Sequence, residues 1–96
     1  MKKPTARRVT AKTLAAAFAE IEADIESSKR HWSQHLSDET IRLADRKERL
    51  AACEAKGDEY NARFERRQVA HHIEEIAKCN SKLALLAAGQ RVSMWD

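Results

Sequence analysis

Apolar residues recur along this chain at spacings of three, four and seven, which is the periodicity of an amphipathic helix. In the first half of the chain these spacings place five large side chains on one helical face: Leu14, Phe18, Ile21, Ile25 and Trp32. Residues 20–26 also alternate between polar and apolar, as a strand would. Because alanine-rich sequence precedes them and Ile21 and Ile25 keep the helical spacing, we predict a helix there.

The sequence does not decide whether this first helix is continuous. A second helix-start signal appears at residues 36–41, where Ser37 can cap a helix and acidic residues follow it. No turn residue precedes this signal, and leucines continue across it every seven residues, at Leu36, Leu43 and Leu50. The sequence therefore permits either one long helix over residues 10–56 or two helices with a break near Leu36-Ser37.

Lys56-Gly57-Asp58 is the strongest turn signal in the chain, because glycine suits the residue that ends a helix and Asp58 can cap the next one. A last helix is predicted from there to Gly89. Its residues recur every seven positions in two interleaved columns: Ala62, Val69, Ile76 and Leu83, and Ile73, Asn80 and Ala87. Asn80 either lies in the seam, the row of side chains packed between the helices, where it would fix their register, or faces water.

These elements predict an all-α fold: an antiparallel helical hairpin of two long helices, or of three with a break near Leu36-Ser37, with coiled-coil-like packing. Ala, Glu, Lys, Leu and Arg make up about half of the 96 residues, which is typical of long helices. We expect a flexible basic arm at residues 1–9, a single helical domain at residues 10–89 and a short tail at residues 90–96. Two thin helices bury little, so the apolar stripe needs a third helical element, a second copy of the chain or a protein partner.

The net charge of +3 is unevenly distributed. The first twelve residues contain no acid and five basic side chains: Lys2, Lys3, Arg7, Arg8 and Lys12. The remainder is slightly acidic, so the basic arm is where phosphates or an acidic partner would bind. Four acids in seven residues form an acidic patch: Glu20, Glu22, Asp24 and Glu26. We interpret this patch as a solvated face or a contact between subunits.

Arg42, Arg46 and Arg49 fall on one helical row and offer a second basic surface. Acidic residues stand four positions before Arg42 and Arg49, which is typical of an ordinary solvated helix, and we favour that interpretation. Aromatic residues that could stack on nucleic-acid bases are few. We expect four of them in the core: Phe18, Trp32, Tyr60 and Phe64.

His31 and His35 are four residues apart and share a helical face, a spacing used in metal sites. If the first helix folds back at Gly57, residue 35 falls opposite Cys79, which would supply a third ligand. Zinc modules have tighter ligand spacing, so we favour surface histidines and expect no metal or other cofactor. The chain carries no nucleophile-elbow, phosphate-loop, dinucleotide or metallohydrolase motif, and we expect no enzymatic activity.

The longest wholly apolar runs have six residues, far fewer than the roughly 20 that a membrane-spanning helix needs. The two cysteines, Cys53 and Cys79, lie in different segments and form no disulfide framework, which suits a reducing compartment. We therefore expect a cytoplasmic protein without membrane contact.

Together these features favour a small non-enzymatic interaction module, such as an adaptor, inhibitor or accessory factor, that binds a second copy of itself or a larger host protein. Its predicted contact residues are Ile73, Ile76 and Leu83 on the apolar stripe and Met94 and Trp95 in the tail, since tryptophan is a favoured anchor. The alternative is a nucleic-acid-associated protein that contacts phosphates without reading sequence, through its basic arm, Lys12 and the row of Arg42, Arg46 and Arg49.

Overall fold

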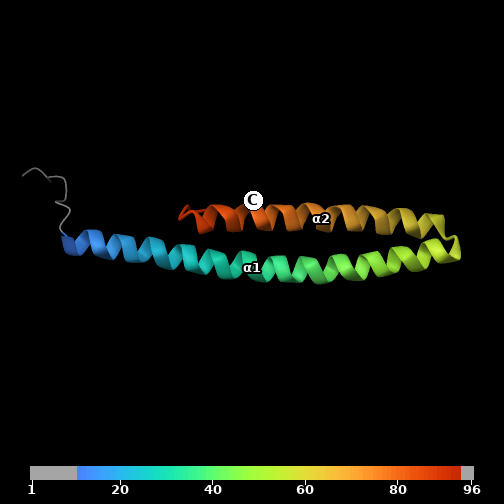
Figure 1. Cartoon of the computed structure of the whole chain (residues 1–96), viewed down its shortest axis with the longest axis horizontal. Helices are drawn as coiled ribbons and strands as arrows, with labels where there is room; N and C mark the ends of the chain where they lie inside the picture. The colour runs from blue at the N-terminus through green and yellow to red at the C-terminus, as the bar shows by residue number, and fades with distance from the viewer. Residues whose placement is uncertain (1–10, 94–96) are drawn as a thin grey trace, which may run out of the picture.

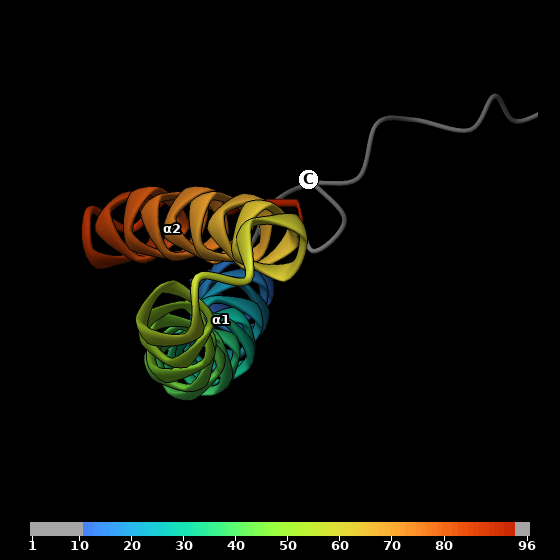
Figure 2. The same ribbon diagram turned by 90° about the vertical axis from the view of Figure 1, so that its right-hand side faces the viewer.

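The computed structural model describes residues 11–93, which form two antiparallel helices joined by a tight turn. Helix α1 spans Ala11–Lys56 and helix α2 spans Glu59–Ala87. Figure 1 shows them side by side as one hairpin, and Figure 2 shows the same pair from the end that carries the turn. The prediction of an all-α helical hairpin is confirmed. The predicted basic arm lies outside the described residues.

Helix α1 is continuous through Leu36 and Ser37, so the version of the hairpin with a break at this point is excluded. The hydroxyl of Thr40 donates to the carbonyl oxygen of Leu36 at 2.8 Å, a bond that threonine makes inside a helix. A capping residue stabilises a helix end only where the preceding backbone leaves the helical conformation. Nothing before Ser37 forces it to do so, because the segment contains neither glycine nor proline.

Gly57 closes the turn between the helices with a φ of 70°, in the left-handed region. Its N–H donates to the carbonyl oxygen of Glu54 at 3.1 Å, and the N–H of Asp58 donates to that of Cys53 at 2.9 Å, which together form a Schellman motif. The Asp58 carboxylate then caps α2 by accepting hydrogen bonds from the side-chain and backbone nitrogens of Asn61. These bonds lower the pKa of the Asp58 carboxyl. The predicted turn and cap are confirmed.

Replacing Gly57 by alanine is expected to lower the free energy of unfolding by about 1–2 kcal/mol, because a Cβ atom is strained at positive φ. No other heavy atom beyond its chain neighbours lies within 4 Å of the place that this Cβ would take, so the loss comes from the backbone conformation alone. Urea unfolding followed by circular dichroism measures the change. Gly57→Asn is the control, since asparagine tolerates the left-handed conformation better; equal losses in the two variants would contradict this explanation.

The seam repeats every seven residues, as in a coiled coil. The predicted α2 column is confirmed, because its members are buried or half-buried: Ala62, Val69, Ile76 and Leu83. The second predicted column is wrong, because its members are all exposed: Ile73, Asn80 and Ala87. The buried second column stands one residue earlier: Glu65, His72, Cys79 and Leu86. Successive seam residues in a coiled coil are alternately three and four positions apart. In α2 each residue of the first column is followed three positions later by a buried one, as Ile76 is by Cys79, and not four positions later, where Asn80 stands. Asn80 therefore faces water.

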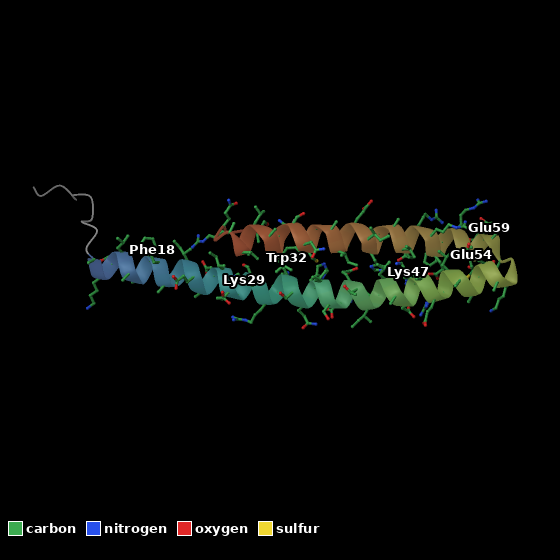
Figure 3. All side chains as sticks on the ribbon, viewed as in Figure 1. Phe18, Lys29, Trp32, Lys47, Glu54 and Glu59 are labelled. Atoms are coloured by element: carbon green, nitrogen blue, oxygen red, sulfur yellow. The ribbon has the colours of Figure 1, made fainter. Side chains whose placement is uncertain are left out.

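An apolar cluster fills the seam toward the open end of the hairpin. It centres on Trp32, Cys79 and Leu86, none of which is more than 2% exposed. Four half-buried side chains pack around it: Ile25, Leu36, Leu83 and Val92. Figure 3 shows Trp32 between the two helices. The Nε1–H of Trp32 is buried without a hydrogen-bond partner among residues 11–93, so this residue is held by the contacts of its ring: the apolar cluster and the Lys82 ammonium, 5.6 Å from the ring centre.

The residues after α2 fold back along the hairpin. Gly89 ends the helix with a φ of 80°, as predicted. Arg91 then donates to Asp24 at 3.0 Å, and Val92 packs against the apolar cluster. The carbonyl oxygen of Ser93 accepts a hydrogen bond from Lys82 at 3.3 Å. The chain therefore leaves the end of α2 in the direction of the turn.

Nearer the turn, the seam contains two polar pairs. His72 and Glu39, 8% and 4% exposed, are hydrogen-bonded across the helices, and Arg42 also donates to Glu39 at 3.0 Å. Seven residues further along α1, Arg46 donates to Glu65 across the seam at 3.3 Å. Burial alone raises the pKa of the Glu39 carboxyl, but the hydrogen bonds and charges of His72 and Arg42 outweigh it and hold this pKa below its usual value. Glu39 is therefore held as a carboxylate in the centre of the hairpin.

Three of the four aromatic side chains expected in the core are instead exposed: Phe18 by 55%, Tyr60 by 85% and Phe64 by 43%. Trp32 alone of the four is buried. Phe64 stands next to the seam residue Glu65, and the Arg46 guanidinium lies 5.7 Å from the centre of its ring. Phe18 is exposed for a different reason, because α2 ends before it reaches this part of α1.

Candidate functional site

Helix α1 extends beyond the end of α2 as an unpaired helix (Figure 1). The apolar cluster of the hairpin reaches back along α1 as far as Ile25. We call the segment before it, residues 11–24, the overhang. It is about 21 Å long at 1.5 Å per residue, and every one of its residues is exposed.

The overhang carries an apolar face that continues the seam. Leu14, Phe18 and Ile21 are 44%, 55% and 36% exposed, and they keep the helical spacing that leads to Ile25 and Trp32. Figure 3 shows Phe18 on the part of α1 that has no α2 beside it, and Trp32 further along, between the helices. Helix α2 therefore covers only the second part of the predicted stripe.

Charge is separated along the overhang. Lys12 lies in the first turn of α1, which contains no acidic residue. The other end carries three residues of the acidic patch, Glu20, Glu22 and Asp24, and the fourth, Glu26, follows just beyond the overhang. Asp24 pairs with Arg91 at 3.0 Å and Glu26 with Lys29 at 3.2 Å, whereas Glu20 and Glu22 form no ion pair within residues 11–93. The end of the overhang nearest α2 is thus strongly acidic.

A hollow of about 290 Å³, which we call the notch, opens where α2 ends. Its apolar lining comes from Ile25 on α1 and from Leu86 and Ala87 on α2. Its charged lining comes from Glu22, Glu26 and Lys29, and Lys29 is paired with Glu26. The notch therefore connects the apolar face of the overhang to the apolar cluster of the hairpin, with acidic groups beside it.

The five residues predicted to bind a partner lie in different settings. Ile73 is 49% exposed on α2. Ile76 and Leu83 are half-buried in the seam, and Leu83 packs against the apolar cluster. Met94 and Trp95 lie outside the described residues. The overhang, which presents three large apolar side chains together, was not among the predicted contact residues.

The arginines of the predicted basic row on α1 do not form one free basic surface. Arg46 is half-buried in the seam with Glu65. Arg42 and Arg49 donate to carboxylates of their own helix, Glu39 at 3.0 Å and Asp45 at 3.1 Å. Each of the three guanidinium groups therefore already has a carboxylate partner. Lys12 is exposed in the overhang, and the remaining basic candidates lie outside the described residues: Lys2, Lys3, Arg7 and Arg8.

The three candidate metal ligands, His31, His35 and Cys79, do not converge. His35 faces Glu75, with 3.4 Å between its Nε2 and the carboxylate, while Cys79 packs in the apolar cluster. The predicted placement of residue 35 opposite residue 79 is therefore wrong by about one helical turn. The Schellman bond from Asp58 to Cys53 sets residues five apart beside each other at the turn. The two polar pairs of the seam follow the same register, which places Glu75 rather than Cys79 opposite His35.

The donor groups themselves also fit a metal poorly. Burial, reinforced by the nearby carboxylates of Glu75 and Glu39, raises the pKa of the Cys79 thiol, whereas a metal ligand must be a thiolate. The rings of His31 and His35 stack with their centres 6.5 Å apart. Within residues 11–93, no group of three or more His, Cys, Asp or Glu side chains is placed to hold a metal ion.

Comparison with protein families, with curated proteins and with solved structures finds no match for the chain. In the part of the chain that the structure describes, neither helix combines the length and the apolar character that crossing a bilayer requires. Of the large apolar side chains that are exposed within residues 11–93, three lie together on the overhang, beside the acidic patch and the notch.

Proposed function

We propose that this chain is a small non-enzymatic protein-interaction module that binds its partner through the apolar face of the overhang. One observation carries the proposal: the packed seam continues past the end of α2 as three large exposed side chains, Leu14, Phe18 and Ile21. Taking a large apolar side chain from full exposure to full burial contributes about 1.5–3 kcal/mol, and because these three are about half exposed, each still offers about half of that to a partner. A partner helix or groove that covers this face therefore gains a substantial free energy of binding.

Charge supports a protein partner over a polyanion. The acidic patch stands beside the apolar face and repels phosphates. The arginines that could have formed a second basic surface, Arg42, Arg46 and Arg49, are each paired with a carboxylate. A nucleic-acid role would therefore depend mainly on the basic arm.

This proposal places the main contact surface on α1. Ile76 and Leu83 contribute to holding the hairpin together, because they lie in the seam. Ile73 remains a candidate secondary contact on α2, and Met94 and Trp95 remain predicted anchors. A module of this kind acts as an adaptor, inhibitor or accessory factor, because it offers binding area without a catalytic centre.

Affinity capture from the source cells at moderate salt tests the proposal, with the wild-type chain, Phe18→Glu and Ile41→Glu as baits. Ile41 is the matched control, since it is an apolar residue of the same helix, 67% exposed, and lies outside the overhang. We expect the wild type and Ile41→Glu to retain a stoichiometric protein after nuclease treatment, and Phe18→Glu to retain about tenfold less. Recovery of nucleic acid alone, or equal capture by all three baits, would contradict the proposal.

A further inference from the structure

Beyond the overhang, the apolar side of α1 is covered by α2, a helix that runs in the opposite direction. Over residues 11–24 the same side of the same helix is uncovered, and its apolar face ends at the notch. We infer that the missing cover is the overhang of a second copy of this chain, antiparallel to the first and related to it by a two-fold axis near Phe18. The inference rests on the proposed function and names the partner of that surface.

A second overhang fits this place in both length and direction. Antiparallel alignment of two copies of residues 11–24 sets Phe18 of each copy close to the axis and Leu14 of each copy beside Ile21 of the other. The start of each helix then reaches the notch of the other copy. Both overhangs are covered by a single contact between identical surfaces, so assembly closes at two chains.

Charge favours the antiparallel arrangement over the parallel one. One end of the overhang is acidic, and the other end holds Lys12 and follows directly on the basic arm. Antiparallel pairing brings the basic end of each copy to the acidic patch of the other, whereas parallel pairing sets like charges side by side. The helix dipole acts in the same direction, because the first turn of α1 contains no acid and its partial positive charge would meet Glu22, the carboxylate at the notch that has no ion pair within residues 11–93.

Other occupants agree less well with these features. A nucleic acid or an anionic membrane would meet the acidic patch beside the apolar face. Of the residues that follow α2, Arg91 pairs with Asp24 at the inner end of the overhang. Val92 then packs on the apolar cluster and Ser93 is hydrogen-bonded to Lys82, so the chain continues toward the turn and leaves the apolar face of the overhang uncovered. A second copy covers the apolar face and also brings each charged end of the overhang beside an end of opposite charge.

The contact is small. Two helical segments of about 21 Å bury less than the roughly 1,200 Å² at which standard interfaces begin. We therefore expect a dissociation constant in the micromolar range, so that the dimer forms and dissociates with changes in protein concentration.

Sedimentation equilibrium of the full chain, from about 1 µM to 1 mM, tests the inference. The wild type should behave as a monomer–dimer equilibrium, and Phe18→Glu should weaken the dimer by at least about tenfold, because it places two carboxylates near the axis. Ile41→Glu is the matched control and should associate like the wild type. Circular dichroism confirms that each variant remains helical. A wild type that stays monomeric, or an equal weakening by both variants, would overturn the inference.

The direction of pairing is tested by mixing chains of opposite charge. An antiparallel pair places Leu14 beside the partner's Ile21, so the Leu14→Glu chain should associate with the Ile21→Lys chain more tightly than either variant does with itself. A mixture of Leu14→Glu with Leu14→Lys gains no such contact. Stronger association in this second mixture would show parallel pairing and would contradict the inference.

The two proposals fail separately. If the wild type is monomeric throughout the concentration range but captures another protein in a way that depends on Phe18, the second-copy inference fails and the proposed function stands. If Phe18→Glu changes neither self-association nor capture, both fail.

Discussion

Replacing Trp32 by alanine is expected to lower the free energy of unfolding by about 3–5 kcal/mol. Trp32 is the largest side chain of the apolar cluster and is only 2% exposed. Its truncation leaves a cavity between the two helices, and within residues 11–93 no third helix packs against them to fill it. Small domains are stable by about 5–15 kcal/mol, so the loss removes a large part of what holds the hairpin together.

Urea unfolding followed by far-ultraviolet circular dichroism measures this effect. Tyr60→Ala is the control, because Tyr60 is also aromatic but 85% exposed, and its loss should stay within about 0.5 kcal/mol. Trp32→Phe should cost much less than Trp32→Ala, since it keeps a ring in the cluster and removes the unpaired buried Nε1–H. Equal losses in Trp32→Ala and Tyr60→Ala would show that the hairpin is not held together at Trp32.

The features of the fold that depend on neighbours in the sequence were predictable. Gly57 and Asp58 act within the turn itself, and helical spacing needs only the chain's own order of residues. The continuity of α1 was undecided because Ser37 is a good cap in isolation, and whether it acts as one depends on the backbone before it. These are local questions, and the sequence holds most of the information that answers them.

The composition of the seam was harder to predict. Ile73 and Ala87 look better suited to a buried column than Glu65 and His72, so a search for apolar periodicity chooses the wrong column. What makes the polar column possible is the opposite helix, where Glu39 meets His72 and Arg46 meets Glu65. Their pairing depends on the register between helices, which no local pattern in the sequence specifies.

The overhang, in contrast, could have been predicted from the sequence. A turn at Gly57 and a helix end at Gly89 make the second helix much shorter than one that begins near Thr10. Antiparallel pairing from the turn outward must then leave the start of the first helix uncovered. The exposed state of Phe18 follows from that difference in length and not from any property of its neighbours.

We expect the stability of the hairpin to fall as the pH drops below about 4.5, and the substitution Glu39→Gln to remove part of this dependence. Burial alone raises the pKa of Glu39, but His72 and Arg42 outweigh it, so that this pKa lies below the ordinary value of 4.5 in the folded chain. The unfolded chain therefore binds the proton more tightly than the folded chain does. The stability that Glu39 contributes is present above pH 4.5 and is lost as the pH falls through the folded-state pKa.

Near neutral pH, Glu39→Gln should cost about 1–3 kcal/mol, because His72 loses a charged partner in the seam. The double replacement Glu39→Leu and His72→Leu removes both buried polar groups together, so we expect it to recover the wild-type stability or exceed it.

Urea unfolding at a series of pH values from about 3 to 7 measures the stability of each variant and its dependence on pH. Glu48→Gln, at an exposed site on the same helix, is the control and should follow the wild-type pH profile. Asp58 and Glu59 also have lowered pKa values, so the Glu39→Gln profile should become flatter without becoming flat. Parallel profiles for the wild type and Glu39→Gln would show that the buried pair does not stabilise the hairpin through its charge.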